Sequence, residues 1–312
     1  MNELEVREPV LWTLWRNARG IVAEMRPLEW SKNLLVFSGV IFSRSLLDAA
    51  NFRLALLGFA VFCLASSSIY IFNDLCDIRA DREHPIKRGR PLASGDLNIN
   101  LARLSFAVML AGSAIGAFAL GLEFGLIVAI YVSSCVAYSL GLKHVVILDA
   151  IIIAGGFVLR AVAGAALIGV SASEWLVLCT SMVALLIAFG KRRHELALLD
   201  DAAPTHRRSL GDYSISFLDN IMAICAGAAI ITYSLYTRAD ETVARIGSHW
   251  MLITIPFVIY GVFRYLFLIH VRGAGGDPVQ ILFRDRPTLL NLILWAAAVI
   301  AVIYLPKLSL AL

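Results

Sequence analysis

Runs of about twenty apolar residues recur along almost the whole chain, and they restrict its possible folds more than any other feature. A run of this length is what an α-helix needs to cross the hydrocarbon core of a bilayer. Nine runs qualify, and we expect each to be a membrane-spanning helix. They cover residues 34–51, 54–73, 103–121, 124–141, 145–170, 174–190, 216–236, 249–270 and 288–308. The first run is the weakest, because Arg44 and Asp48 interrupt it.

The composition excludes an ordinary soluble fold. Of the 312 residues, 59% are hydrophobic and 16% are charged, whereas soluble domains are about 45–50% apolar and about 25% charged. Within lipid, a helix satisfies its own backbone hydrogen bonds. We therefore predict an all-α integral membrane protein with one polytopic domain, residues 1–312. We expect no nucleic-acid partner, and the sequence leaves the oligomeric state open.

Lys and Arg residues are distributed unevenly between the two sides of the predicted bundle. The N-terminal segment and the loops on its side carry 19 of them, and the opposite side carries 5. Because cytoplasmic loops are enriched in Lys and Arg, we expect the N-terminus in the cytoplasm, the C-terminus outside, and the chain in the cytoplasmic (inner) cell membrane. Residues 1–33 should be a cytoplasmic segment. Its Leu11, Trp12, Leu14 and Trp15 favour a short interfacial helix, and a frayed polar tail is the alternative.

The end of the second run carries the most informative motif. Four residues, Asn73, Asp74, Asp77 and Asp81, fall within an arc of roughly 100° on a helix. Carboxylates gathered on one face repel each other unless a cation neutralises them. Oxygen ligands of this kind suit Mg²⁺, which is usually shared with substrate phosphates. We therefore predict a magnesium site there, and a solvated acidic helix end is the alternative.

A basic loop follows this motif directly. Lys87, Arg88 and Arg90 lie in a segment shaped by Gly and Pro, after Pro85 has ended the helix. Basic side chains beside a metal-binding carboxylate cluster are what a diphosphate or a phosphosugar requires. The alternative is a plain positively charged cytoplasmic loop, which explains the charge but not its position beside the acidic motif.

Later segments repeat this combination of charged and polar residues. Tyr138 lies near the end of the fourth run, and Lys143 follows it. Asp149 and Arg160 share one face of the fifth run, where an internal ion pair is the alternative to a functional role. The sixth run ends in a basic stretch with one carboxylate, and here a solvated helix end is the alternative. This stretch contains Lys191, Arg192 and Glu195.

The acidic motif and the basic loop together resemble the first aspartate-rich motif of the UbiA superfamily of membrane prenyltransferases. This resemblance implies a nine-helix UbiA-like bundle with its active-site cavity facing the cytoplasm. It also implies Mg²⁺ as cofactor, with Asn73, Asp74, Asp77 and Asp81 as ligands. The chain departs from the usual pattern after the sixth run, where a second motif, D-x-x-x-D, is expected. Residues 190–195 there read Gly-Lys-Arg-Arg-His-Glu.

Further residues resemble one branch of that superfamily, the decaprenyl-phosphate phosphoribosyltransferases. They are Arg26-Pro27 with Trp30, Lys32 and Asn33, then Asp81 to Pro85, Tyr138 to His144, Leu159 to Ala161 with Gly164, Gly190 to Arg192 with Glu195, and Arg284 to Arg286. The branch implies transfer of a 5-phosphoribosyl group from phosphoribosyl diphosphate to a polyprenyl phosphate, with release of diphosphate. It places this reaction in the synthesis of arabinan precursors for the cell wall.

The resemblance assigns a role to each candidate. Asp74, Asp77 and Lys191 are the expected catalytic residues. Lys191 and Arg192 would hold the ribose 5-phosphate or the lipid phosphate. The remaining expected substrate-binding residues are Lys32, Asp81, Lys87, Arg88, Arg90, Tyr138, Lys143, Arg160 and Glu195.

Two alternatives to this function remain open from the sequence. One is a UbiA-type prenyltransferase that moves a prenyl group from a prenyl diphosphate to an aromatic or other acceptor. The other is a transporter or channel. Transporters place their ionisable groups near the middle of the bilayer, whereas the acidic motif here lies at a helix end, which disfavours that class.

Overall fold

The computed structural model describes residues 10–83, 85, 87–199, 210–276 and 278–308, and within these ranges the regular secondary structure is entirely helical. Eight helices are long and apolar enough to cross a membrane. They are α3 (Ala49–Glu83), α5 (Ile99–Leu120), α6 (Leu122–Leu140), α7 (Leu148–Leu167), α8 (Glu174–Leu199), α10 (Ile215–Arg238), α12 (Ile255–His270) with the preceding 3₁₀-helix η6 (Trp250–Thr254), and α14 (Arg286–Leu308). They match the last eight of the nine predicted runs.

The first predicted run, residues 34–51, does not form a spanning α-helix. It is divided among the 3₁₀-helix η1 (Pro27–Phe37), the short helix α2 (Ser38–Phe42), a turn, and the first residues of α3. Arg44, which has a φ of 62°, and Asp48 lie in that turn. The count of nine spanning helices is therefore not confirmed within the described residues.

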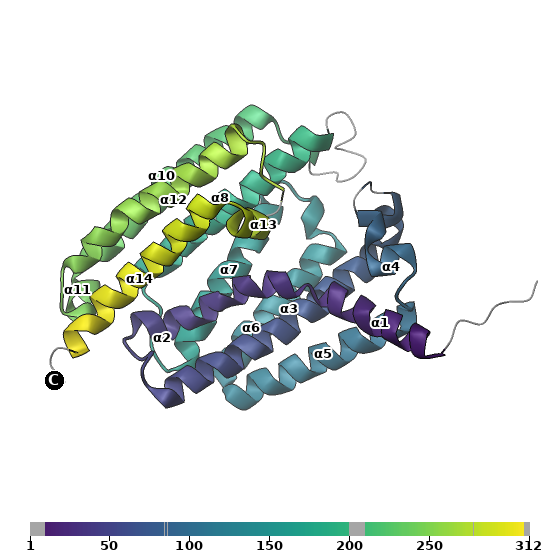
Figure 1. The fold of residues 1–312 in the computed structure, drawn as a ribbon, viewed down its shortest axis with the longest axis horizontal. Coiled ribbons are helices and arrows are strands. Elements are labelled where there is room, and N and C mark those ends of the chain that lie inside the picture. The colour runs from purple at the N-terminus through teal and green to yellow at the C-terminus, as the bar shows by residue number, and fades with distance from the viewer. Residues whose placement is uncertain (1–9, 84, 86, 200–209, 277, 309–312) are drawn as a thin grey trace, which may run out of the picture.

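The η1–α2 segment nevertheless runs along the bundle, antiparallel to α3. Its Trp30 indole donates to the Ser67 hydroxyl at 3.0 Å, and its Asn33 amide donates to the Ser66 hydroxyl at 3.2 Å. Further along, Val36 lies beside Gly58 of α3. As the segment advances, its partners on α3 thus move steadily toward the start of that helix. In Figure 1 the same path leads from α1 at one end of the bundle to α2 at the other.

Two glycines allow this segment to approach α7 closely. A Cβ atom on Gly164 of α7 would lie 2.0 Å from the carbonyl oxygen of Val36, and one on Gly39 would lie 2.2 Å from the carbonyl oxygen of Gly164. Only residues without a side chain permit such contact between two backbones. Small residues are the usual means of close helix packing within membranes.

The buried side chains form several neighbouring clusters. One joins η1, α3, α6 and α7 through Val36, Phe62, Phe124 and Val128. A second joins α7, α8, α10 and α12 through residues such as Phe189, Leu218 and Val262. A third joins α10, η6 and α14. The bundle therefore has packed halves that meet at α7, with α7 contributing to both.

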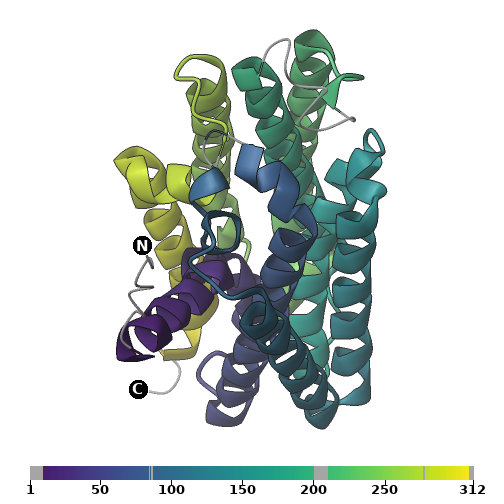
Figure 2. The same cartoon turned by 90° about the vertical axis from the view of Figure 1, so that its right-hand side faces the viewer.

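The N-terminal helix α1 (Val10–Met25) lies at the margin of the bundle (Figures 1 and 2). Trp12, Leu14, Trp15 and Val22 remain between 51% and 61% exposed, and the indoles of Trp12 and Trp15 stack at 5.3 Å. The helix itself agrees with the sequence prediction, and its position at a membrane interface stays a prediction.

The remaining elements are short and lie between the long helices. On the side of the acidic motif they are η2 (Lys87–Gly89), α4 (Pro91–Ser94), η3 (Leu142–His144) and α13 (Pro278–Arg284). At the other end of the bundle α11 (Asp240–Ile246) lies near α2, where the Arg44 guanidinium donates to the carbonyl oxygens of Arg245 and Ile246.

Candidate active site

Asp74 is the centre of the acidic motif in the last turns of α3. Its side chain is only 1% exposed. The Arg26 guanidinium donates to both of its carboxylate oxygens, at 2.7 and 2.5 Å, and the Arg90 guanidinium donates to one of them at 2.9 Å. Two cations therefore compensate one buried carboxylate.

The backbone between α1 and η1 delivers Arg26 to this position. Arg26 adopts a left-handed conformation, with φ 52° and ψ 64°, directly before Pro27. A non-glycine residue in this region is uncommon and often marks a functional constraint. Its guanidinium also lies over the Tyr70 ring, 4.9 Å from the centroid. The break between α1 and η1 thus places a cation against α3.

Arg90 joins the acidic motif to the loop that follows it. Its guanidinium contacts Asp81 at 2.6 Å as well as Asp74. Arg90 is extended, as expected before a proline, and Pro91 begins α4. The predicted proximity of basic loop and acidic motif is therefore confirmed for Arg90. Lys87 lies within electrostatic reach of Asp81, Asp77 and Glu195. Arg88 is exposed on η2.

Glu24 of α1 adds a carboxyl group that the sequence did not suggest as part of the site. It is 1% exposed and accepts the backbone N–H of Leu92 at 3.0 Å. Burial and a hydrogen bond with Asp74 raise the pKa of Glu24 to about 8. The raised pKa favours the protonated form of Glu24, which can donate a hydrogen bond to the Asp74 carboxylate.

Asn73 and Asp77 face a different neighbour, the end of α6 and η3. The Ser139 hydroxyl donates to the Asn73 side-chain oxygen at 3.1 Å, and the Lys143 ammonium contacts Asp77 at 2.6 Å. Asp77 is 28% exposed. The acidic motif is thus held from two sides, with Asp74 and Asp81 on one and Asn73 and Asp77 on the other.

This division differs from the compact cluster of ligands predicted from the helical spacing. In the part of the chain that the structure describes, no group of three or more His, Cys, Asp and Glu side chains stands close enough to hold one metal ion. Arg26 and Arg90 bind Asp74, and Arg90 also binds Asp81, whereas Lys143 binds Asp77 from the opposite side. The carboxylates are therefore paired with cations and do not converge on one point. The oxygen atoms themselves suit Mg²⁺, which needs only one or two carboxylates beside water and substrate oxygens.

Arg192 of α8 lies at the centre of a second network and is 1% exposed. Its guanidinium donates to Asp149 at 2.6 Å, to Glu195 at 2.5 Å and to the Tyr138 hydroxyl at 3.1 Å. The Tyr213 hydroxyl donates to Asp149 at 3.0 Å. A contact between Arg192 and a substrate phosphate would require some of these bonds to open. Asp149 pairs with Arg192 and not with Arg160, so the ion pair considered within α7 is not present.

Three more predicted residues converge inside the bundle. Lys32 of η1 forms a salt bridge with Glu29 and lies within electrostatic reach of both Arg160 and Lys191. Arg160 is 5% exposed. Its guanidinium donates to the Asn33 side-chain oxygen, to the carbonyl oxygen of Gly156 and to the Tyr131 hydroxyl, at 2.7, 2.7 and 2.9 Å.

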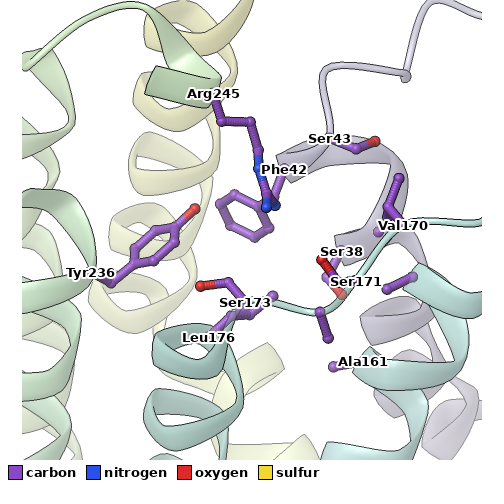
Figure 3. A pocket seen from close by; sticks show the side chains of 13 residues that line it. Ser38, Phe42, Ser43, Ala161, Val170, Ser171, Ser173, Leu176, Tyr236 and Arg245 are labelled. Atoms are coloured by element: carbon purple, nitrogen blue, oxygen red, sulfur yellow. The ribbon is translucent and has the colours of Figure 1, made fainter. Parts of the chain in front are cut away.

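An open cleft of about 370 Å³ lies beside the acidic motif. Arg26 and Arg90 line it, together with Glu29 of η1 and the α13 residues Val279 and Gln280. It can admit a charged molecule to the Asp74 side of the motif. A second pocket, at the end of the bundle that carries α11, holds only about 20 Å³, close to the space of one water molecule. Tyr236, Arg245 and several serines line that pocket (Figure 3).

The sequence analysis quoted Arg26 and Asn33 for the family resemblance and considered Asp149 without assigning any of the three to the site. The residues of these networks that it did not consider at all are Glu24, Tyr131, Ser139 and Tyr213. Most are single polar residues in apolar or unremarkable surroundings, and no local spacing links them to the acidic motif. For Arg26 the signal was the Arg26-Pro27 pair already quoted for the resemblance, which lies where α1 ends and η1 begins.

Comparison with known proteins shows similarity over nearly the whole chain. The model of the UbiA prenyltransferase family matches residues 34–210. A decaprenyl-phosphate phosphoribosyltransferase of Mycolicibacterium smegmatis is 33% identical, covering 91% of this chain and 92% of that protein. The protein of the same description from Mycobacterium tuberculosis is 32% identical, covering 90% and 93%.

Solved structures show the same fold. A UbiA homolog from Archaeoglobus fulgidus bound to GPP and Mg²⁺ superimposes with a TM-score of 0.71 at 21% identity, covering 91% of this chain and 99% of that one. A structure described as digeranylgeranylglyceryl phosphate synthase matches with a TM-score of 0.60 at 17% identity, covering 91% and 99%.

Proposed function

Because this chain belongs to the UbiA prenyltransferase family, and is thus a multi-pass membrane protein, we propose that it transfers a 5-phosphoribosyl group from phosphoribosyl diphosphate to a polyprenyl phosphate. The bond between the anomeric carbon and the diphosphate oxygen breaks, and the diphosphate leaves with the electron pair. A bond forms between the anomeric carbon and an oxygen of the lipid phosphate. The products are a polyprenyl phosphoribose and diphosphate.

One observation carries this proposal. The relatives described as decaprenyl-phosphate phosphoribosyltransferases are 32–33% identical and align over nine-tenths of both chains. Their similarity therefore includes α3 with its acidic motif, the basic loop and α8. The alternative, transfer of a prenyl group from a prenyl diphosphate, lacks support in α8, because Lys191 and its neighbours stand where a second D-x-x-x-D motif would be expected.

The chemistry of the site is consistent with this transfer. The acceptor phosphate is already an anion, so a strong general base is not required, and the main barrier is the departure of diphosphate. When bound, Mg²⁺ would neutralise charge on the leaving group. Asp74 and Asp77, one helical turn apart, would hold it, with Asn73 and Asp81 beside them. Arg26, Arg90 and Lys143 are paired with these carboxylates, so these ion pairs would have to open when Mg²⁺ binds.

The charged residues of this chain have further roles in the proposed reaction. Arg26 and Arg90 line the open cleft and would exchange Asp74 for diphosphate oxygens as the donor enters. Charge-assisted hydrogen bonds of this kind are among the strongest polar contacts. Lys87 and Arg88 would raise the local concentration of the anionic donor. We place this end of the bundle in the cytoplasm and the chain in the inner membrane, on the basis of the Lys and Arg distribution.

A direct assay tests the proposal. Purified protein in nanodiscs receives phosphoribosyl diphosphate, decaprenyl phosphate and Mg²⁺, and mass spectrometry detects polyprenyl phosphoribose. A parallel reaction contains geranyl diphosphate and an aromatic acceptor. Product in the first reaction and not the second supports the phosphoribosyltransferase, and the reverse result favours the prenyltransferase. Asp240→Asn, at the exposed start of α11, is the matched control for substitutions in the acidic motif.

A further inference from the structure

The buried guanidinium of Arg160 binds neutral protein groups from three segments. Its side chain is 5% exposed. One nitrogen donates to the Asn33 side-chain oxygen of η1 at 2.7 Å, and a second donates to the carbonyl oxygen of Gly156 on α7 at 2.7 Å. The third donates to the Tyr131 hydroxyl of α6 at 2.9 Å. Each nitrogen of this cation therefore has an acceptor supplied by the protein itself.

Aromatic rings surround the same guanidinium. Its central carbon lies 4.6 Å from the centroid of the Tyr131 ring and 5.8 Å from the centroids of Phe62 and Phe157. The negative face of an aromatic ring attracts a cation, and the attraction is stronger where water is excluded. The rings and the three acceptors together stabilise this buried charge, and they do so without an anionic substrate.

Asn33 connects this cation to a second helix. It is 0% exposed. Its side-chain oxygen accepts from Arg160, and its amide nitrogen donates to the Ser66 hydroxyl of α3 at 3.2 Å. The two ends of one amide thus bind α7 and α3, with η1 held between them. A buried amide with both ends occupied fixes the position of the backbone that carries it.

The contacts between η1 and α7 also follow the pitch of the two segments. Arg160 meets Asn33, and Gly164, four residues later on α7, meets Val36, three residues later on η1. Four residues of an α-helix advance about 6 Å, as do three residues of a 3₁₀-helix. Three residues of an α-helix would advance only about 4.5 Å. The 3₁₀ winding therefore keeps η1 in register with α7, and Arg160 makes one of the two matching contacts.

The segment that Arg160 contacts carries two cations of the candidate site. Arg26 directly precedes η1, and its guanidinium binds Asp74. Lys32 directly precedes Asn33. A shift of η1 along α7 would therefore move both cations relative to the acidic motif.

We propose that Arg160 is a positioning residue, which locks η1 in register with α7 through Asn33 and so orients Arg26 and Lys32 toward the reacting groups. This role replaces the substrate contact that the family resemblance implies for Arg160. Its effect on turnover rests on the proposed function, whereas the lock on η1 is a property of the fold and can be measured without substrate.

Hydrogen–deuterium exchange, followed by mass spectrometry on the full chain in nanodiscs, measures opening of η1 in the absence of substrate. The variants are Asn33→Ala, which removes the acceptor on η1, and Arg160→Lys, which keeps the charge but loses the planar fork of donors. Each should speed exchange of the η1 amides about tenfold or more, because a buried hydrogen bond to a charged group is lost. Tyr131→Phe is the matched control. It removes an acceptor of Arg160 on α6 and retains the ring, so η1 should stay within about threefold of wild type.

Turnover of phosphoribosyl diphosphate and decaprenyl phosphate separates positioning from substrate binding. Asn33→Ala and Arg160→Lys should lower kcat by a similar factor, about tenfold or more, because a small misplacement of reacting groups is costly. The double variant should be no slower than Arg160→Lys, since both substitutions remove the same contact. The KM of each substrate should stay within about threefold of wild type, because no substrate contact is removed.

Two results would overturn the positioning role. One is η1 exchange within about twofold of wild type in Asn33→Ala, a variant that leaves Arg160 in place and decides the question even where Arg160→Lys does not fold. The other is a raised KM for one substrate in Arg160→Lys while Asn33→Ala turns over as wild type, which would assign Arg160 to that substrate. Faster η1 exchange in both variants, with no phosphoribose product from the wild type, would overturn the proposed function and leave the lock on η1 in place.

Discussion

Two guanidinium groups, from Arg26 and Arg90, donate to the one buried carboxylate of Asp74. Such an arrangement stabilises the fold only while all partners are present, because a buried charge that loses its counter-ion is strongly destabilising. Asp77, in contrast, is 28% exposed and has one partner, Lys143. The two aspartates therefore differ in structural role although both are expected to serve the same chemistry.

We predict that Asp77→Asn abolishes most activity and leaves stability nearly unchanged. Losing a charged group beside the departing diphosphate should cost about 3 kcal/mol or more, which corresponds to about a hundredfold lower kcat/KM. Product formation and thermal unfolding, followed by tryptophan fluorescence, measure the two effects. Asp77→Asn with more than a tenth of wild-type activity would contradict a role in catalysis, and Asp240→Asn should behave as wild type in both assays.

We predict that Asp74→Asn lowers stability as well as activity. The substitution leaves two guanidinium groups opposite a neutral amide, and breaking a buried ion pair costs about 3–5 kcal/mol. The unfolding temperature should fall markedly below that of Asp77→Asn. Equal unfolding temperatures for the two variants would show that the ion pairs of Arg26 and Arg90 with Asp74 do not stabilise the fold.

Glu24 should tolerate amidation but not truncation. Its raised pKa favours the protonated form at neutral pH, and Glu24→Gln retains the donor toward Asp74 that this form has and the acceptor for the Leu92 N–H. Glu24→Ala removes both and leaves the N–H without its partner, which costs about 1–3 kcal/mol. Thermal unfolding at pH 7 should place Glu24→Gln near wild type and Glu24→Ala well below it. A Gln variant as unstable as the Ala variant would refute the protonated state.

The sequence predicts the residues of the acidic motif because they are close in the chain and follow the helical repeat. Asp74, Asp77 and Asp81 could be placed on one face of a helix from their spacing alone. Their partners could not be identified in this way. Arg26 and Glu24 approach α3 only because α1 breaks before Pro27, and Arg192 meets Asp149 only because α7 and α8 pack together. Such contacts depend on tertiary structure.

The η1–α2 segment shows the same limit at the scale of an element. Residues 34–51 are apolar enough to predict a spanning α-helix, but hydropathy does not report backbone geometry. The segment is instead wound partly as a 3₁₀-helix and approaches α7 through Gly39 and Gly164. Its Lys32 and Asn33 are thereby carried into the bundle, where Asn33 accepts a hydrogen bond from Arg160.

We predict that Gly164→Ala destabilises the protein and that Gly155→Ala, on the same helix, does not. The new Cβ at residue 164 would lie 2.0 Å from the Val36 carbonyl oxygen, whereas nothing lies within 4 Å of a Cβ at residue 155. Overpacking of this kind costs about 1–3 kcal/mol, and here the obstacle is backbone that cannot rotate away. Thermal unfolding measures the difference, and equal stability of the two variants would contradict the close approach of η1 to α7.

The whole molecule has two chemically different ends. The end of α3 gathers Arg26, Arg90 and Lys143 around carboxylates and opens into a cleft. The other end carries α2 and α11 and a pocket the size of one water molecule. The sequence predicted this polarity through the positions of Lys and Arg in the loops. It also predicted the eight long helices, because each is a continuous apolar run of sufficient length.

The orientation of these two ends in the membrane is the last prediction. Because cytoplasmic loops are enriched in Lys and Arg, the end with the acidic motif should face the cytoplasm, and α11 should face outward.

Two cysteine variants test this orientation. In a chain whose own five cysteines are replaced by alanine, Asp96→Cys after α4 and Asp240→Cys at the start of α11 place one exposed thiol at each end. A membrane-impermeant maleimide added to spheroplasts should label residue 240 and not residue 96. Inverted membrane vesicles should give the opposite pattern. Labelling of residue 96 from outside would place the acidic motif on the outer side of the membrane and would contradict the predicted orientation.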